Sequence, residues 1–166
     1  MLSTTKKVHT SLVNLENFSI LLVSPYPEDL TAVRRILHHS DWQIARSDGA
    51  KQAAKHLTQN ACSILICERD LPDGSWKDVL QQTASLQHPP MILVMSRHAD
   101  EGLWAEVLNL GGYDVLLKPF DNHELTRVVG MAWRHWSGSF LGKKANSASA
   151  SVSGTYPRAD FSIAVS

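Results

Sequence analysis

Residues 111–121 read GGYDVLLKPFD, and the chain after them has the features of a helix start. Residues 113–117 form a short apolar run, which is typical of a strand buried on both faces. Asp121 is a favoured N-cap residue, and Glu124 follows three positions later, as in a capping box. The stretch therefore predicts a buried strand, a short loop and a helix.

The same alternation of apolar runs and helical patterns extends back through the chain. Short apolar runs precede this stretch at 18–23, 42–45, 63–67 and 91–95. Between the runs, apolar residues recur at helical spacing over 27–39, 50–57, 75–86 and 103–110. The last helix keeps this pattern to Trp136. Because strands that alternate with helices are joined by right-handed crossovers, we expect an α/β fold, a doubly wound five-stranded parallel sheet with five helices.

Three zones of composition define the domain organisation. Residues 1–16 are polar and mixed, and we expect a flexible lead-in there. Residues 17–136 carry all the regular periodicity and form the expected domain. Residues 137–166 are dominated by Ser, Ala and Gly and cannot bury enough apolar area to offset the entropy of ordering. We therefore expect a disordered tail from Ser137.

Charge and cysteine content narrow the class of protein. Lys plus Arg and Asp plus Glu number 16 each, so the basic surplus typical of nucleic-acid binding is missing. No apolar run has the length of a membrane span, and the N-terminus lacks a secretory signal, so we expect a cytoplasmic protein. Cys62 and Cys67 lie an odd number of positions apart in one expected strand, so they should face opposite sides and stay reduced. Neither belongs to a CxxC pair, and the sequence supports no metal site.

In a doubly wound sheet, functional loops lie beyond the carboxyl ends of the strands. Taken in order, these loops resemble the conserved corners of the response-regulator receiver family across residues 17–136. GGYDVLLKPFD resembles the last corner, in which Lys118 matches the invariant lysine and Pro119 the proline that follows a cis peptide bond. ILVMSRHAD places Ser96 at the Ser/Thr position of the family, and ICERDLPDGSW resembles the region after its third strand.

The departures from the family pattern concern its phosphorylation site. The resemblance implies two Mg²⁺-binding acids at the end of the first strand, but Ser24 and Pro25 occupy those positions. Glu68 replaces the phosphoacceptor aspartate, and Val115 replaces the aromatic switch residue. Because Mg²⁺ binds chiefly through carboxylates and phosphate, we expect no bound metal or other cofactor.

Glu68 has two interpretations. Its carboxylate extends one methylene further than that of Asp, toward Lys118, and an ion pair between them would hold the site in one arrangement. Alternatively, Glu68 is a tolerated acid in a decayed site. Glu28 and Asp29 could reach the site, but acids at a helix start commonly stabilise the macrodipole, and we favour that role for both.

A working phosphoacceptor is the alternative function. It would be phosphorylated on Glu68 or Asp70, with Mg²⁺ held by Glu28 or Asp29. An acceptor at Asp70 would abandon the register of the family match and lie in the loop. Asp73, further along the same loop, is interpreted as a turn residue.

Three tryptophans are candidates for contact with a partner. Trp76 replaces a glycine of the family pattern and could cap the site or anchor a partner. Family members often pair through the fourth helix, fifth strand and fifth helix, and Trp104 and Trp133 could mark such a surface. The alternative for both residues, which we favour, is partial burial against neighbouring loops.

Together these features predict a stand-alone pseudo-receiver, a signalling module of a two-component or phosphorelay pathway. It is expected to act through protein–protein contacts and not to be an enzyme. Expected partners are proteins of the pathway, such as a histidine kinase or a regulator, or a second copy of the chain. We expect no nucleic-acid or membrane partner. A small-ligand binder of the same fold would need a phosphate-binding loop or a cobalamin motif, and the loops supply neither.

Overall fold

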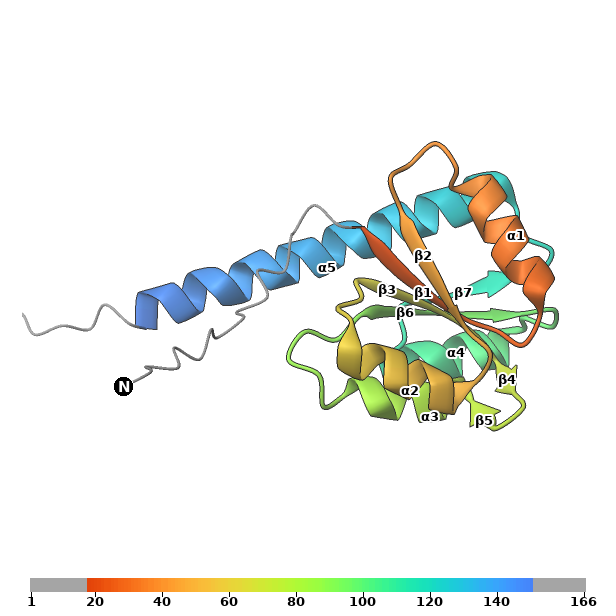
Figure 1. Ribbon diagram of the computed structural model, residues 1–166, viewed down its shortest axis with the longest axis horizontal. Coiled ribbons are helices and arrows are strands. Elements are labelled where there is room, and N and C mark those ends of the chain that lie inside the picture. Colours follow the sequence, from red (N-terminus) through yellow and green to blue (C-terminus); the bar gives the residue numbers. More distant parts are fainter. Residues whose placement is uncertain (1–17, 151–166) are drawn as a thin grey trace, which may run out of the picture.

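A five-stranded parallel sheet forms the centre of the molecule, in the order β2-β1-β3-β6-β7 (Figure 1). The computed structural model describes the backbone of residues 18–150 and the side chains of residues 18–143. The sheet strands are β1 (Ser19–Val23), β2 (Gln43–Ser47), β3 (Ile64–Glu68), β6 (Met91–Ser96) and β7 (Asp114–Leu117). Each corresponds to one of the predicted apolar runs, so the doubly wound α/β fold is confirmed. A short antiparallel hairpin, β4 (Asp70–Leu71) and β5 (Gly74–Ser75), lies outside this sheet and was not predicted.

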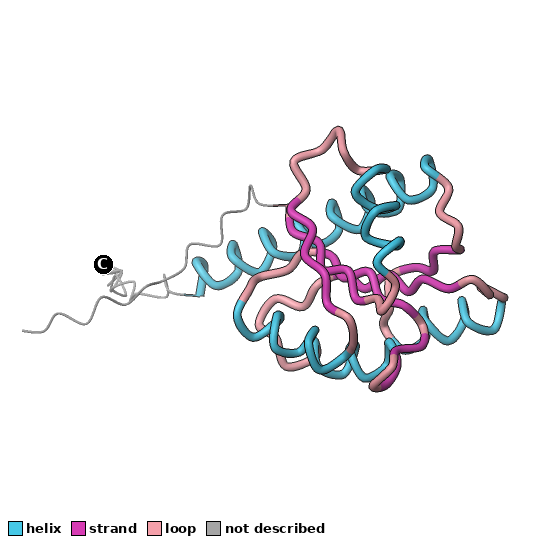
Figure 2. The backbone as a smooth tube through the Cα atoms, turned by 45° about the vertical axis from the view of Figure 1, so that its right-hand side comes forward, coloured by secondary structure: helices cyan, strands magenta, loops and turns pink. Residues whose placement is uncertain are grey.

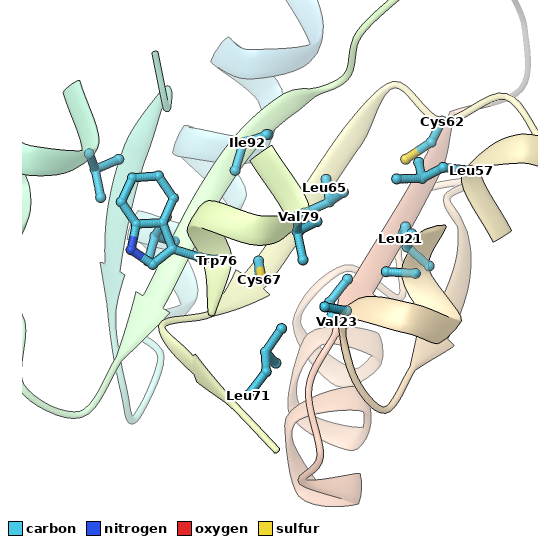
Figure 3. Packing of buried hydrophobic residues seen from close by; sticks show 14 of the residues in the cluster. Leu21, Val23, Leu57, Cys62, Leu65, Cys67, Leu71, Trp76, Val79 and Ile92 are labelled. Atoms are coloured by element: carbon cyan, nitrogen blue, oxygen red, sulfur yellow. The ribbon is translucent and has the colours of Figure 1, made fainter. Parts of the chain in front are cut away.

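Two layers of helices cover the sheet, as Figure 1 shows. One face carries α1 (Pro27–Ile36) and α5 (Asn122–Ala150), and the other carries α2 (Ala50–Gln59), α3 (Trp76–Thr83) and α4 (Glu101–Leu110). Alternate strand residues serve the two cores. In β1, Ile20 packs in the cluster beneath α1 and α5, whereas Leu21 belongs to the opposite cluster, part of which Figure 3 shows. Burial on both faces explains why the strands read as continuous apolar runs.

Polar side chains fix where the helices begin. The Oδ1 atom of Asp121 accepts a hydrogen bond of 2.8 Å from the Glu124 amide, which confirms Asp121 as the N-cap of α5. Ser75 and Asp78 form a complete capping box at the start of α3. The carboxylate of Asp73 accepts hydrogen bonds from the first two amides of α2, although α2 lies far earlier in the chain. The interpretation of Asp73 as a turn residue missed this tertiary cap.

The fifth helix is longer than expected and continues beyond the sheet to Ala150 (Figures 1 and 2). A disordered tail from Ser137 is therefore wrong for residues 137–150. Tertiary contacts stabilise the beginning of this extension. The Nε1–H group of Trp136 donates to the Pro89 carbonyl, and Phe140 stacks on Trp136 and packs against His88. Residues 1–16 and 151–166, for which we expected a lead-in and a tail, lie outside the described residues. None of the helices in the described chain is long and apolar enough to cross a bilayer.

The two cysteines face the same side of the sheet, contrary to the prediction. Cys62 and Cys67 both belong to the core cluster shown in Figure 3, and both are free thiols. Cys62 precedes β3, which begins at Ile64, so strand alternation does not relate the two residues. Burial raises the pKa of the Cys62 thiol to about 12.

Candidate functional site

The site lies at the carboxyl ends of β1, β3 and β7. The sheet order changes direction between β1 and β3, and the loops that follow strands at such a switch point commonly form ligand sites. Ser24 directly follows β1, Glu68 is the last residue of β3, and Lys118 directly follows β7. All three side chains are buried. The tertiary structure thus brings together residues that the sequence placed at separate corners.

Lys118 is the centre of this site. Its peptide bond to Pro119 is cis, and its backbone N–H group donates to the Ser96 carbonyl at 2.9 Å. Its Nζ atom forms ion pairs with Oε2 of Glu68 and, at 3.0 Å, with Oδ2 of Asp29. The ion pair that one of the two interpretations of Glu68 required is therefore present in the structure.

Asp29 is the site residue that the sequence analysis misjudged. It lies in the first turn of α1, is only 5% exposed, and accepts a hydrogen bond of 2.6 Å from the Ser24 hydroxyl. Assignment of both helix-start acids to the macrodipole is wrong for Asp29. Pro27 starts the helix so soon after β1 that the first turn of α1 lies over the end of the strand. An acid two positions after Pro27 was the signal that could have indicated this.

Tyr26 is a second residue that the sequence analysis did not single out. Its ring centroid lies 4.8 Å from the Nζ atom of Lys118, within the range of a cation–π interaction. The Tyr26 amide donates to the Ser24 hydroxyl at 3.0 Å, which fixes the loop between β1 and α1. Lys118 therefore interacts with two carboxylates and one aromatic face.

Two negative charges and one positive charge leave the site with a net charge of −1. Burial raises the pKa of Glu68 above its usual value, and the negative charge of Asp29 raises it further. The hydrogen bond and the charge of Lys118 oppose this shift. The net shift of the Glu68 pKa is upward, because the positive charge of Lys118 is shared with Asp29.

The donor set does not fit the Mg²⁺ ion of the receiver family. Mg²⁺ needs close to octahedral oxygen coordination, usually with carboxylates from the protein. Pro25 offers no side-chain oxygen, and the Ser24 hydroxyl is engaged with Asp29. Glu68 and Asp29 each direct one carboxylate oxygen at the ammonium group of Lys118, which reduces the negative charge available to a metal ion. Over the part of the chain that the structure describes, no group of three or more His, Cys, Asp or Glu side chains is arranged to hold a metal.

Other candidates from the sequence lie near the site but have different roles. The Ser96 hydroxyl accepts from the His98 amide at 3.1 Å, so it closes a local turn. Val115 is buried in the core cluster beneath α2, α3 and α4. Asp70 is exposed, and its nearest basic partner is Arg69 at 3.7 Å. The structure does not bring Asp70 into the site, which weakens its case as a phosphoacceptor.

The three tryptophans differ in exposure. Trp76 is 1% exposed and lies within the core, so it neither caps the site nor can anchor a partner. Figure 3 shows its ring among the buried side chains. Trp133 is partly buried, and its ring centroid lies 4.7 Å from that of Phe18. This agrees with the favoured interpretation of Trp133 as a partly buried residue. Trp104 is 51% exposed, and its Nε1–H group donates to Oδ1 of Asp114 at 2.9 Å.

A sheet of this order, with a carboxylate ending its middle strand and a lysine following its last, defines a receiver-type signalling domain. Residues 20–130 match the response regulator receiver domain, and the chain belongs to this family. The family resemblance inferred from the loop motifs is therefore confirmed.

Two curated transcriptional regulatory proteins share this region. The chain is 22% identical over 122 residues to ZraR of Escherichia coli, a match that covers 72% of this chain and 28% of ZraR. It is 26% identical over 99 residues to FixJ of Bradyrhizobium diazoefficiens, with 60% of this chain and 48% of FixJ covered. The chain thus spans less than half the length of either relative.

Solved structures show the same fold. The signal receiver domain of an HD domain-containing protein from Pseudomonas fluorescens superposes with a TM-score of 0.69 at 22% identity, covering 76% of this chain and 93% of that one. The chemotaxis response regulator CheY4 of Vibrio cholerae gives a TM-score of 0.63 at 14% identity, covering 70% and 98%.

Proposed function

We propose that this chain is a pseudo-receiver, a signalling module that acts through protein–protein contacts independently of phosphorylation. The observation that carries the proposal is the double engagement of Lys118 by Asp29 and Glu68. In a phosphorylated receiver, the corresponding lysine would neutralise charge on the phosphoryl group. Here the positive charge of Lys118 is paired with the carboxylates of Asp29 and Glu68.

Loss of the metal set supports the same proposal. Phosphoryl transfer to a carboxylate depends mainly on positioning and on neutralisation of charge by cations. Ser24 and Pro25 supply no carboxylate, so Glu68 lacks the two neighbouring acids that would hold Mg²⁺ beside a phosphodonor. We therefore propose that the domain binds no cofactor and is not an enzyme.

The two side chains that would respond to phosphorylation, at positions 96 and 115, are also unable to do so. Val115 has no aromatic ring to move between two positions, and it is buried. The Ser96 hydroxyl is engaged by the amide of His98. With Lys118 held by two acids, these features favour one constant arrangement of the loops, and we propose that a partner recognises this arrangement.

The proposed partners are proteins of a two-component pathway, such as a histidine kinase or a regulator, in the cytoplasm. The proposed contact surface comprises α4, β7 and α5, where Trp104 is exposed. A second copy of the chain could use the same surface. We propose no nucleic-acid partner for this domain.

The intact mass of the protein after incubation with Mg²⁺ and acetyl phosphate tests the proposal. We expect an unmodified mass under conditions in which a competent receiver domain gains one phosphoryl group. A variant with Ser24→Asp, Pro25→Asp and Glu68→Asp restores the acids of the family pattern. It is the positive control, and we expect it to gain one phosphoryl group. A mass gain in the natural chain that Glu68→Gln abolishes would overturn the proposal and establish Glu68 as a phosphoacceptor.

A further inference from the structure

A hollow of about 560 Å³ lies between the start of α4, the end of β7 and the first turn of α5. Its apolar lining consists of Ala99, Trp104, Val115 and Leu117. Its acidic lining consists of Asp100, Glu101 and Glu124. None of the residues that line it is basic. Three carboxylates and no basic side chain among its lining residues make the hollow an acidic surface beside an apolar one.

Trp104 gives the hollow a fixed aromatic wall. The hydrogen bond from its Nε1–H group to Asp114 holds one edge of the indole ring, while half of the side chain stays exposed. An exposed tryptophan that is already oriented loses little conformational entropy when a ligand covers it. Val115 contributes a small side chain at the base, and the exposed side chain of Leu117 extends the apolar surface.

We propose that this hollow binds an arginine side chain from a basic segment of the partner protein. A guanidinium group can stack on the face of Trp104 while it donates hydrogen bonds to Glu101 and Glu124. Its aliphatic stem would cover the exposed side chain of Leu117, as long charged side chains commonly do on apolar surfaces. This inference rests on the proposed function and specifies the chemistry of the partner.

Charge complementarity favours arginine over an apolar side chain as the occupant. Asp100 already accepts a hydrogen bond of 2.7 Å from the Leu103 amide as the N-cap of α4. An apolar anchor would desolvate the carboxylates of Glu101 and Glu124 without giving them a partner, which is unfavourable. Lysine would satisfy the charge, but its compact ammonium group lacks the planar surface that stacks on an indole ring. The fork of the guanidinium group suits a site that combines carboxylates with an aromatic wall.

Indole N–H resonances of the ¹⁵N-labelled full chain provide the readout. The probe is a five-residue peptide with a central arginine flanked by leucines, and its control carries citrulline, which is uncharged but nearly the same shape. We expect the arginine peptide to shift the Trp104 indole resonance, identified by Trp104→Phe, and to bind about tenfold more tightly than the citrulline peptide. Equal affinity of the two peptides, or shifts that leave Trp104 unchanged, would overturn the proposal.

Variants locate the binding site. Glu101→Gln and Glu124→Gln should each weaken the arginine peptide several-fold, whereas Glu106→Gln should not, because Glu106 pairs with Lys77 and does not line the hollow. Sedimentation without peptide tests a second copy as the occupant. A dimer that dissociates in Trp104→Ala would overturn the arginine proposal. Absence of peptide binding, combined with an unmodified mass after acetyl phosphate, would reject this inference alone and leave the pseudo-receiver proposal intact.

Discussion

The Nζ atom of Lys118, after β7, lies 3.0 Å from Oδ2 of Asp29, in the first turn of α1. The same ammonium group also binds the carboxylate of Glu68 at the end of β3. One buried positive charge is thus shared by two acids from different elements. If one of the two acids is removed, the other still pairs with Lys118. Single and double substitutions should therefore have different effects on stability.

The two acids should substitute for each other in stabilising Lys118. Asp29→Asn or Glu68→Gln alone should lower the free energy of unfolding by about 1 kcal/mol or less, because one ion pair remains. The double variant leaves a buried ammonium group without a counter-charge, and we expect a loss of about 3–5 kcal/mol. Urea unfolding of the four proteins in the cycle measures the coupling.

Addition of Lys118→Met to the double variant is the control. It removes the last buried charge, so much of the lost stability should return. Strictly additive single losses in the double variant would contradict the sharing of Lys118.

Stability should depend on pH through Glu68. Because the folded state raises the pKa of Glu68, it binds more protons than the unfolded state between the usual pKa and the raised one. The contribution of Glu68 to stability is therefore fully present below its usual pKa and is lost as the pH rises through the raised pKa. The difference in unfolding free energy between the natural chain and Glu68→Gln should decrease across this window. A difference that increases with pH would show that Lys118 outweighs burial.

Asp73 should stabilise the start of α2 from a distance. Its Oδ1 and Oδ2 atoms accept from the amides of Ala50 and Lys51 at 2.8 and 2.9 Å. Asp73→Ala should therefore lower the free energy of unfolding by about 1 kcal/mol, the usual effect of a lost N-cap. Thermal or urea unfolding measures it, with the exposed neighbour Asp70→Ala as the matched control. Equal effects of the two substitutions would contradict the cap.

Gly49 belongs to the same contact. A Cβ atom at Gly49 would lie 2.4 Å from Oδ1 of Asp73, so Gly49→Ala should displace the carboxylate from the amides of α2. We expect Gly49→Ala to remove most of the effect of a subsequent Asp73→Ala substitution, because both changes abolish the same cap.

The first turns of α5 beyond Trp136 should depend on one aromatic contact. The ring centroid of Phe140 lies 5.5 Å from that of Trp136, with the rings stacked, and 4.6 Å from that of His88. Phe140→Ala should increase amide hydrogen exchange over 137–143, because little other packing opposes fraying there. Leu141→Ala is the control, since Leu141 is 53% exposed. Equal exchange in both variants would indicate that the helix does not depend on the contact.

Local patterns in the sequence determined the fold and the positions of three residues at strand ends near the site. Burial on both faces makes each strand a continuous apolar run, and helices require apolar residues at their own spacing. These are properties of short segments, so the positions of Glu68, Ser96 and Lys118 at strand ends followed from the sequence. The sequence also allowed a Glu68–Lys118 ion pair as one of two interpretations, because parallel strands bring those ends to one edge of the sheet.

Contacts between distant segments were decided only by the tertiary structure. Asp29 looked like a helix-start acid until the packing of α1 placed it within reach of Lys118. Asp73 was interpreted as a turn residue, but in the folded chain it accepts hydrogen bonds from the first two amides of α2. Trp76 is recognised as a core residue only from the packing of α3. The contacts of Trp136 and Phe140 in α5 are with Pro89 and His88, which are far from the helix in the chain. In each case the deciding partner is remote in sequence, and periodicity carries no information about such a partner.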